Sequence, residues 1–264
     1  MNRAYTRFIA VGVFVLLSAT AGAAQDFSKR YELGAGGHIN IHSVSGDVKV
    51  TGYNGNVVLV TAVKEGRDRD RVDVEDLSSG DRIELRSRYP EHCNCDASVN
   101  FTVQVPRGTK YSFDKISSAS GNIEIRGVAG EINGHSASGD VTIEEVEGNV
   151  NAHSASGNVR VMKAVGTVNA HSASGDVEVD LAGVAGAGNM EFTSASGNVR
   201  VKAPADLDAD VEMSCTSGDL KTDFALAVNE PEHGSRRSAR GRLGSGSRSL
   251  RIRSASGNVS LTHN

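Results

Sequence analysis

Apolar and polar residues alternate over short segments in the middle of the chain. In one set of segments the apolar positions are β-branched pairs, namely Val141 and Ile143, Val159 and Val161, and Val177 and Val179. A second set carries smaller residues at alternate positions, namely Ile132, Gly134 and Ser136, Val150, Ala152 and Ser154, and Val168, Ala170 and Ser172. A period of two is typical of a strand with one buried face, so both sets predict short strands.

Glycines separate these segments at a constant interval. They recur every nine residues from Gly121 to Gly175, and they alternate between the phrase SASG and looser segments such as EVEG. The full repeat is therefore eighteen residues long, a regularity typical of solenoids. Tight corners favour glycine, because its backbone reaches angles that a Cβ penalises. We predict an all-β fold, a parallel β-solenoid (β-helix-like) with two-strand, 18-residue coils.

The residue after each SASG-type glycine bears on whether the coils stack. Along the chain this position alternates between acid and amide: Asp47, Asn122, Asp140, Asn158, Asp176, Asn198, Asp219 and Asn258. Equivalent residues of stacked strands lie about 4.8 Å apart, so neighbouring aspartates would repel each other and an intervening Asn separates them. Outward charges on successive coils are also opposite, as for Arg160 and Glu178. We therefore expect equivalent residues to be spatial neighbours.

The regularity of the repeat divides the mature chain. Residues 25–116 contain longer, less regular strands and are expected to form an irregular N-terminal β cap. Residues 117–264 are expected to form the solenoid repeats. Copies of the motif lie further apart after Gly175, which predicts inserted loops, among them a flexible basic insertion at 229–250. The 30 glycines, 5% aromatic content and lack of Trp suit a thin cross-section with little interior to fill.

Residues 1–24 have the pattern of a cleaved secretory signal peptide. Arg3 and Arg7 precede a short apolar run, which small residues follow. The run is shorter than the about 20 residues that span a bilayer, and no second run of that length follows. Loss of the two arginines changes the formal net charge from −4 to −6, which argues against nucleic-acid binding. We expect a periplasmic, secreted or cell-surface protein with no transmembrane segment in the mature chain.

Histidines recur at one outward position of the repeat, at His135, His153 and His171, with His42 at the same place in an early copy. One interpretation is a metal site, although metals need ligands that converge from different directions and a column presents them in parallel. A second is a pH-responsive module, because protonation below about pH 6.5 would place like charges side by side. A third is stacking of a repeated surface side chain.

The segment HCNCD, from His92 to Asp96, is the densest cluster of reactive side chains. Cys93 and Cys95 could form a disulfide in an oxidising compartment, or the cluster could ligate a metal; the sequence leaves both open. Cys215 stands three residues before a corner glycine, where serine stands in other copies. We expect it to be a buried free thiol.

The motifs of common enzymes and cofactor sites are missing from the sequence. The acid follows a single glycine in alternate coils, unlike the G-G-x-G-x-D pattern of calcium-binding repeats, and no serine stands in a G-x-S-x-G elbow. We assign no catalytic, cofactor-binding or metal-binding residue and expect no cofactor. β-Helix enzymes that cleave polysaccharides concentrate charged residues in one groove. The sequence singles out no such groove, and a polysaccharide-active enzyme stays an alternative.

The serial order of the motifs is similar to that of a known family. A signal peptide, an early SGDVKV, a VPRGTKY strand lead-in, serial SASGD or SASGN coils, a Gly-rich loop and a final SASGNVSL resemble the bacterial β-strand-repeat family of candidate adhesins, whose function is unknown. The resemblance covers nearly all of the mature chain and implies an extracytoplasmic β-solenoid without established catalytic residues. We therefore expect a noncatalytic, adhesin-like protein that presents stacked β faces to an envelope protein or a glycan.

Overall fold

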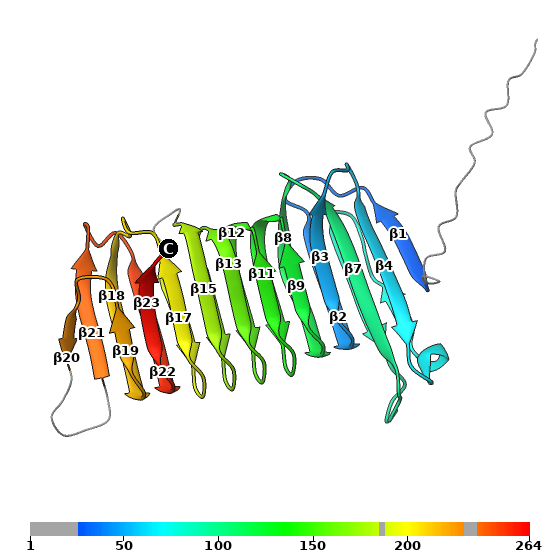
Figure 1. Ribbon diagram of the computed structural model, residues 1–264. Coiled ribbons are helices and arrows are strands. Elements are labelled where there is room, and N and C mark those ends of the chain that lie inside the picture. The colour runs from blue at the N-terminus through cyan, green and yellow to red at the C-terminus, as the bar shows by residue number, and fades with distance from the viewer. Residues whose placement is uncertain (1–25, 185–187, 230–236) are drawn as a thin grey trace, which may run out of the picture.

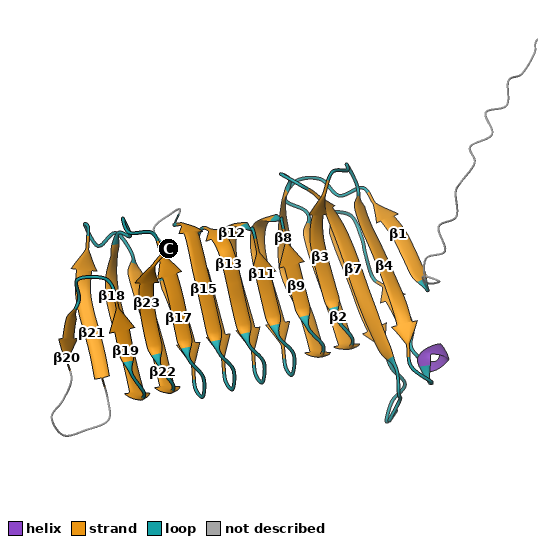
Figure 2. Cartoon of the chain, in the orientation of Figure 1, coloured by secondary structure: helices purple, strands orange, loops and turns teal. Residues whose placement is uncertain are grey.

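The computed structural model describes residues 26–184, 188–229 and 237–264, so the expected signal peptide at 1–24 lies outside the described residues. The described chain is all-β, with 23 strands and one short 3-10 helix, η1 (Arg69–Arg71). The strands lie side by side in a long stack (Figure 1). Loops join them at both ends of the strands (Figure 2).

The strands form two hydrogen-bonded rows, one on each side of the stack. In spatial order the first row is β5 (Asp73–Asp76), β6 (Arg82–Arg88), β2 (His38–Ser45), β8 (Lys110–Ser120), β10 (Ala129–Ser136), β12 (Glu147–Ser154), β14 (Val168–Ser172), β16 (Met190–Ser194), β22 (Ser249–Ser256), β18 (Ala209–Ser217), β21 (Arg237–Leu243) and β20 (Ala227–Asn229). The second row is β1 (Phe27–Tyr31), β4 (Val58–Glu65), β7 (Ser98–Pro106), β3 (Val48–Tyr53), β9 (Ile123–Arg126), β11 (Val141–Glu144), β13 (Val159–Val165), β15 (Val177–Gly183), β17 (Val199–Ala203), β23 (Val259–His263) and β19 (Leu220–Thr222).

Pairing within the rows is largely parallel, as the sequence predicted. Antiparallel pairs among the described strands occur toward the ends of the rows, at β1–β4–β7 and β5–β6 on one side and at β18–β21–β20 on the other. β8 continues across residue 116, where the sequence suggested a boundary between regions. The two rows therefore run without a break from the N-terminal strands into the repeats.

Equivalent residues of successive repeats are direct neighbours. Val141 pairs with Val159, and Val159 pairs with Val177. These valines are buried, because strand alternation turns every second side chain inward. The interval of eighteen residues is thus the step from one strand to the next in its row.

Glycine is required at the two kinds of corner for different physical reasons. The looser corners at Gly130, Gly148 and Gly166 have φ values of 127°, 131° and 143°, a range that favours glycine. The SASG glycines lie outside this range, and the expectation that backbone angles require them is wrong. A Cβ at Gly157 would instead overlap the carbonyl group of Gly139 on the preceding coil. The SASG glycines are therefore needed because adjacent coils approach closely.

The last coil in the sequence is not the last coil in space. β22 and β23 lie between the β16–β17 coil and the β18–β19 coil. Asn258 is consequently a neighbour of both Asn198 and Asp219. The strict alternation of Asp and Asn along the sequence is thus broken at one step of the stack.

Part of the basic insertion is a strand, which corrects the expectation of a flexible loop over 229–250. Residues 237–243 form β21, which pairs antiparallel with β18, while residues 230–236 lie outside the described chain. Arg242 pairs with Asp210 at 2.7 Å and Arg240 with Glu212 at 2.9 Å. The arginines alternate with smaller residues, so their charges lie beside the acids of β18.

A ladder of Asp and Asn side chains follows the SASG corners. Each side-chain oxygen accepts a hydrogen bond from the backbone N–H of the equivalent residue on the next coil. Successive N–H donors along the stack are those of Asn122, Asp140, Asn158, Asp176, Asn198, Asn258 and Asp219, at N–O distances of 2.8, 2.9, 2.7, 3.0, 2.8, 3.0 and 2.8 Å. The ladder satisfies backbone donors that the turn leaves free.

Asn158→Asp should destabilise the stack, because it places a third carboxylate between Asp140 and Asp176. The variant also loses the amide that donates to Asp140 at 3.3 Å. We expect the free energy of unfolding to fall by about 1 kcal/mol at pH 7 and low salt, with partial recovery at high salt. Urea unfolding at two ionic strengths measures this. Asn258→Asp is the matched control and should cost about half as much, because one of its two neighbours is an amide; equal costs would contradict the explanation.

Candidate functional site

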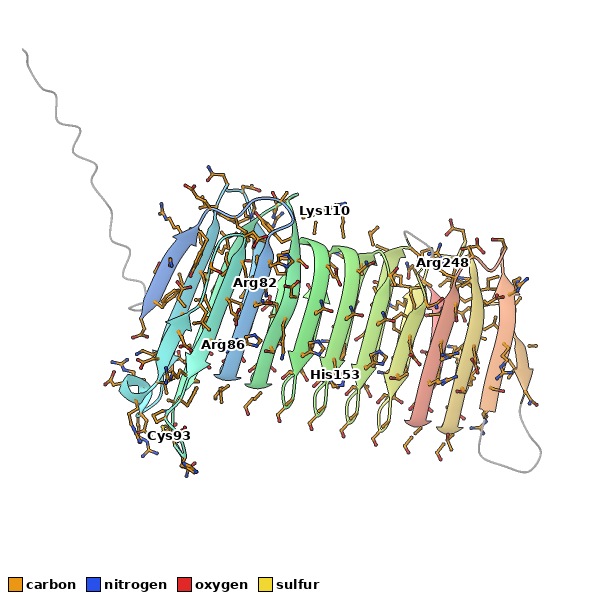
Figure 3. All side chains as sticks on the ribbon, turned by 180° about the vertical axis from the view of Figure 1, so that it is seen from behind. Arg82, Arg86, Cys93, Lys110, His153 and Arg248 are labelled. Atoms are coloured by element: carbon orange, nitrogen blue, oxygen red, sulfur yellow. A yellow bond between two sulfur atoms is a disulfide. The ribbon has the colours of Figure 1, made fainter. Side chains whose placement is uncertain are left out.

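A shallow groove runs along the outer face of the first strand row. It consists of two adjoining hollows of about 450 and 810 Å³ that share His153. Figure 3 shows His153 midway along this face. The groove is lined by His42, Ser43, Lys115, Ser117, Ser118, Ala119, His135, Ser136, Ala137, His153, Ala155, His171, Ser172, Ala173, Thr193, Ser194, Ala195, Ser214, Thr216, Arg253, Ser254 and Ala255. We refer to it as the histidine groove.

The repeated phrase HSASG builds this groove. Strand alternation turns each His outward and the next Ser inward, and the turn that follows carries the Ala of the opposite wall. The inward serines fix the floor, because each Oγ donates to the carbonyl oxygen of a glycine on the preceding coil. The donors Ser136, Ser154 and Ser172 do so at 2.9, 2.8 and 2.8 Å. The same side chains therefore recur at every coil on a floor held by hydrogen bonds.

The predicted histidine column is interrupted. His135 and His153 stack with ring centroids 5.9 Å apart, and His153 pairs in register with His171. The Nδ1 of His171 lies 2.7 Å from the hydroxyl of Thr193. His42 is separated from His135 by the β8 strand, whose Ser117 lies 2.9 Å from its Nδ1. Over the described ranges, no group of three or more His, Cys, Asp or Glu side chains is placed to hold a metal ion.

Partial burial lowers the pKa of His135 and His171 below the ordinary histidine value. For His135 the neighbouring His153 and Lys115 lower the pKa further. For His171 the nearby Glu191 opposes the shift, and His153 adds to it. The neutral imidazole, which can both donate and accept a hydrogen bond, is thus favoured in the folded protein.

The free energy of unfolding of the protein should fall on acidification because of the groove histidines. Below about pH 6.5 the unfolded chain takes up protons at His135 and His171 before the folded chain does, so stability falls as pH drops from there toward the lowered pKa values. We expect a His135→Gln/His171→Gln double variant to lose less stability than the unaltered protein between pH 7.5 and 5.5. Urea unfolding at these two pH values measures the difference. Equal losses would contradict the assigned pKa shifts.

A column of asparagines runs beside the histidines, and the sequence analysis did not identify it. Asn151 donates through its side-chain amide to Asn133 at 2.9 Å, and Asn169 donates to Asn151 at 3.1 Å. The backbone N–H of Glu191 continues the chain by donating to Asn169. The signal was the Asn two residues before each His in the repeat. This amide ladder fixes the register of the groove face.

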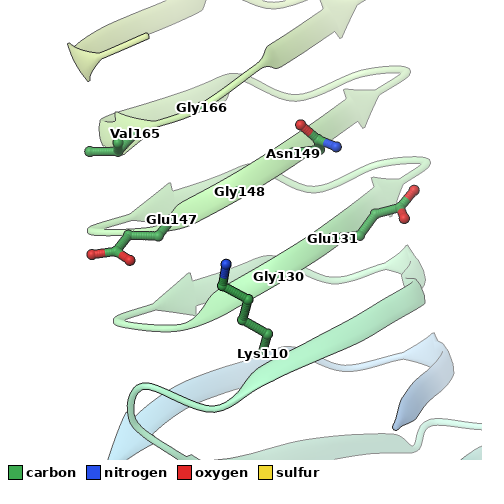
Figure 4. Close-up of a pocket in the computed structure, with 8 residues that line it drawn as sticks. All are labelled: Lys110, Gly130, Glu131, Glu147, Gly148, Asn149, Val165 and Gly166. Carbon is green, nitrogen blue, oxygen red and sulfur yellow. The ribbon is translucent and has the colours of Figure 1, made fainter. Parts of the chain in front are cut away.

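A further hollow, of about 460 Å³, lies over the looser corners (Figure 4). Its base is the glycine column Gly130, Gly148 and Gly166. Lys110, Glu131 and Glu147 project around it. The hollow exists because the glycines have no side chains to fill it.

The structure joins Cys93 and Cys95 in a disulfide, the interpretation that the sequence left open beside a metal site. The carboxylate of Asp96 instead pairs with Arg67 at 2.7 Å. Cys215 is a buried free thiol, as expected, and lies in register with Ser254. Burial raises its pKa, which favours the unreactive thiol form.

The chain was compared with solved structures and with curated proteins. Similar solved structures include a candidate cell adhesion protein from Clostridium sporogenes (10% identity, TM-score 0.42, covering 90% of this chain and 99% of that chain). Others are candidate adhesins from Bacteroides fragilis (13% identity, TM-score 0.38) and Parabacteroides distasonis (10% identity, TM-score 0.38), each covering 90% of this chain and 96% of the other. No curated protein matches the sequence.

Two further findings bear on the kind of protein this is. In the described part of the chain no helix has the length and apolarity to cross a membrane. The family model of the toastrack proteins, DUF4097, matches residues 37–262. The match spans most of the chain and nearly all of its strands, and the chain therefore belongs to the toastrack DUF4097 family.

Proposed function

We propose that this chain is a noncatalytic, adhesin-like binding protein that acts in the periplasm or at the cell surface. Residues 1–24 direct export in this proposal, and residues 25–116 cap a β-solenoid of 18-residue coils. The histidine groove holds an extended partner, a glycan or a protein segment. A polymer with a regular repeat would meet equivalent groups at successive coils, because the groove repeats its own side chains.

One observation carries this proposal: the groove is a continuous, periodic surface with a floor held by hydrogen bonds. Ordered side chains lose less conformational entropy on binding, which favours affinity. The imidazoles and hydroxyls that line the groove supply both donors and acceptors. Such a surface suits an extended chain of polar units.

The lining of the groove also supports binding over catalysis. Glycoside hydrolysis ordinarily uses a pair of carboxyl groups on either side of the scissile bond. The side chains that line the histidine groove include none. A polysaccharide-active enzyme is the second candidate function. An enzyme would release new reducing ends from the polymer, whereas a binding protein would not.

The test blocks the groove and leaves the stack intact. Ala155 lines the groove, and Ala155→Trp would fill it with a bulky, uncharged side chain. Thr142→Trp is the matched control, because Thr142 lies on β11 of the second row. Binding is measured on immobilised neutral glycans, anionic glycans and extended peptides, together with the release of reducing ends.

We expect binding without product release, weakened about tenfold or more by Ala155→Trp and unchanged by Thr142→Trp. Equal binding by both variants would show that the histidine groove is not the binding site. Product release would establish the enzyme instead. Failure of the unaltered protein to bind any of these polymers would overturn the proposed function.

A further inference from the structure

The histidine groove differs in charge from the rest of the molecule. The whole chain carries 32 acidic against 28 basic side chains, yet no Asp or Glu lines the groove. Its permanently charged lining residues are Lys115 and Arg253. A negatively charged partner would therefore be attracted to the groove and would face no acidic side chain in its lining.

The Arg253 end of the groove has more guanidinium groups than carboxylates to pair with them. Arg240, Arg251 and Arg253 share the single carboxylate of Glu212, at 2.9, 3.4 and 3.4 Å. The Nε of Arg253 is buried without a hydrogen-bond partner. The buried Nε cannot reach a ligand, but the Arg253 side chain is 39% exposed. Its two terminal amino groups can bind a ligand carboxylate through two parallel hydrogen bonds.

The acids nearest this end lie on the neighbouring column of the same face. Glu191 pairs in register with Arg251, and Arg251 pairs in register with Glu212. Partial burial favours the neutral form of Glu212, but hydrogen bonds from Arg240 and Arg251 and the charge of Arg253 hold its pKa below the usual range. The Glu212 carboxylate thus stays ionised; with Glu191 beside Arg251, two acidic side chains face three arginines at this end.

Positive charges in the groove are also sparse. Lys115 on β8 and Arg253 on β22 are five strand spacings apart along the row, or about 24 Å. The side chains of the histidine column between them are Ser117, His135, His153, His171 and Thr193. A polymer with occasional negative charges and many hydroxyls fits this spacing. A dense polyanion would place charges against uncharged groups.

We propose that the histidine groove binds a linear polysaccharide that bears carboxylates, one of which pairs with Arg253. Sugar hydroxyls of the same polymer bond to the imidazoles and to Thr193 along the groove. This inference rests on the proposed function and names the class of its partner.

The test compares two polymers and two arginine variants. Hyaluronan bears a carboxylate on every second sugar only, and its methyl ester has the same backbone without the charge. Arg253→Gln removes the guanidinium that lines the groove. Arg240→Gln removes another partner of Glu212, on β21 outside the groove lining, and is the control. Arg253→Lys keeps the charge and loses the fork.

We expect the unaltered protein to bind hyaluronan about tenfold or more tightly than its methyl ester. Arg253→Gln should weaken hyaluronan binding by a similar factor, Arg253→Lys by less, and Arg240→Gln little. Urea unfolding checks that each variant is folded. Binding to hyaluronan should weaken as salt rises.

The two proposals fail in different ways. Equal binding of hyaluronan and its methyl ester, still lost in Ala155→Trp, would overturn the role of the carboxylate and leave the groove as a binding site. Equal loss in Arg253→Gln and Arg240→Gln would also overturn the pairing with Arg253. If inorganic polyphosphate binds more tightly than the polysaccharide, the partner is a dense polyanion and the polysaccharide proposal is wrong. If the unaltered protein binds neither neutral nor charged polymers, both proposals are overturned.

Discussion

A Gly157→Ala variant is expected to unfold at a markedly lower temperature and urea concentration than the unaltered protein. The added methyl group would overlap the backbone carbonyl of Gly139 on the preceding coil. A backbone group cannot rotate away as a side chain can, so the two coils would have to separate. We expect a loss of about 3 kcal/mol or more in the free energy of unfolding, which corresponds to about 10 °C.

Gly134→Ala is the control for this prediction, because it makes the same chemical change within the repeat. The nearest atom to a Cβ at Gly134 is a side-chain carbon of Val141 at 3.4 Å, an ordinary contact distance. The next strands carry Ala152 and Ala170 at the equivalent position. We expect Gly134→Ala to be neutral or slightly stabilising. A similar loss in both variants would show that close approach of the coils is not the cause.

The second large effect is expected from Ser154→Ala. The Ser154 side chain is buried, with its residue 0% exposed. Its hydroxyl donates to the carbonyl of Gly139 at 2.8 Å and accepts from the N–H of Gly157 at 2.9 Å. Removal of the hydroxyl would leave a buried donor and a buried acceptor unpaired, at a cost of about 2–4 kcal/mol.

Thermal and urea unfolding again measure the loss of stability, and two further variants serve as comparisons. Ser156→Ala changes an exposed serine two residues further along and should have little effect. Ser154→Cys should lose less than Ser154→Ala, because Cys215 occupies the equivalent buried position beside Ser254. If Ser154→Ala and Ser156→Ala cost the same, the buried hydrogen bonds do not hold the floor.

Local patterns were sufficient to predict the strands and their neighbours. Val159 could be placed beside Val141 because both follow an SASG corner and both alternate with polar residues. The pairing of Arg160 with Glu178, at 3.0 Å, followed from the same reasoning. Such contacts join residues one repeat apart, so the period of the sequence already contains them.

Contacts beyond the repeat could not be predicted in this way. The SASGN copy before Val259 is equally compatible with several places in the stack, because all coils present similar edges. Its position beside Val199 depends on which edges the intervening strands leave free. The role of β21 was missed for a related reason: a segment rich in Arg, Gly and Ser resembles a solvated loop until acids on β18 are seen to neutralise it.

The candidate site was only partly visible in the sequence. The histidine repeat was identified, but a groove depends on the wall formed by turn residues such as Ala155, which carry no chemical signal of their own. The excess of arginines around Glu212 was hidden because Arg240 and Arg253 are separated along the chain from the acid they share. Three-dimensional packing alone brings them together.

The place of β22 and β23 within the rows has a consequence for biosynthesis. During translation the ribosome releases β18 and β19 before these two strands, yet β18 and β19 dock on them. The exposed rim of β16 and β17 must therefore wait, unpaired, for a segment that emerges later. Strands with open edges are prone to mispairing, so a nascent chain at this stage would depend on chaperones to keep it from aggregating.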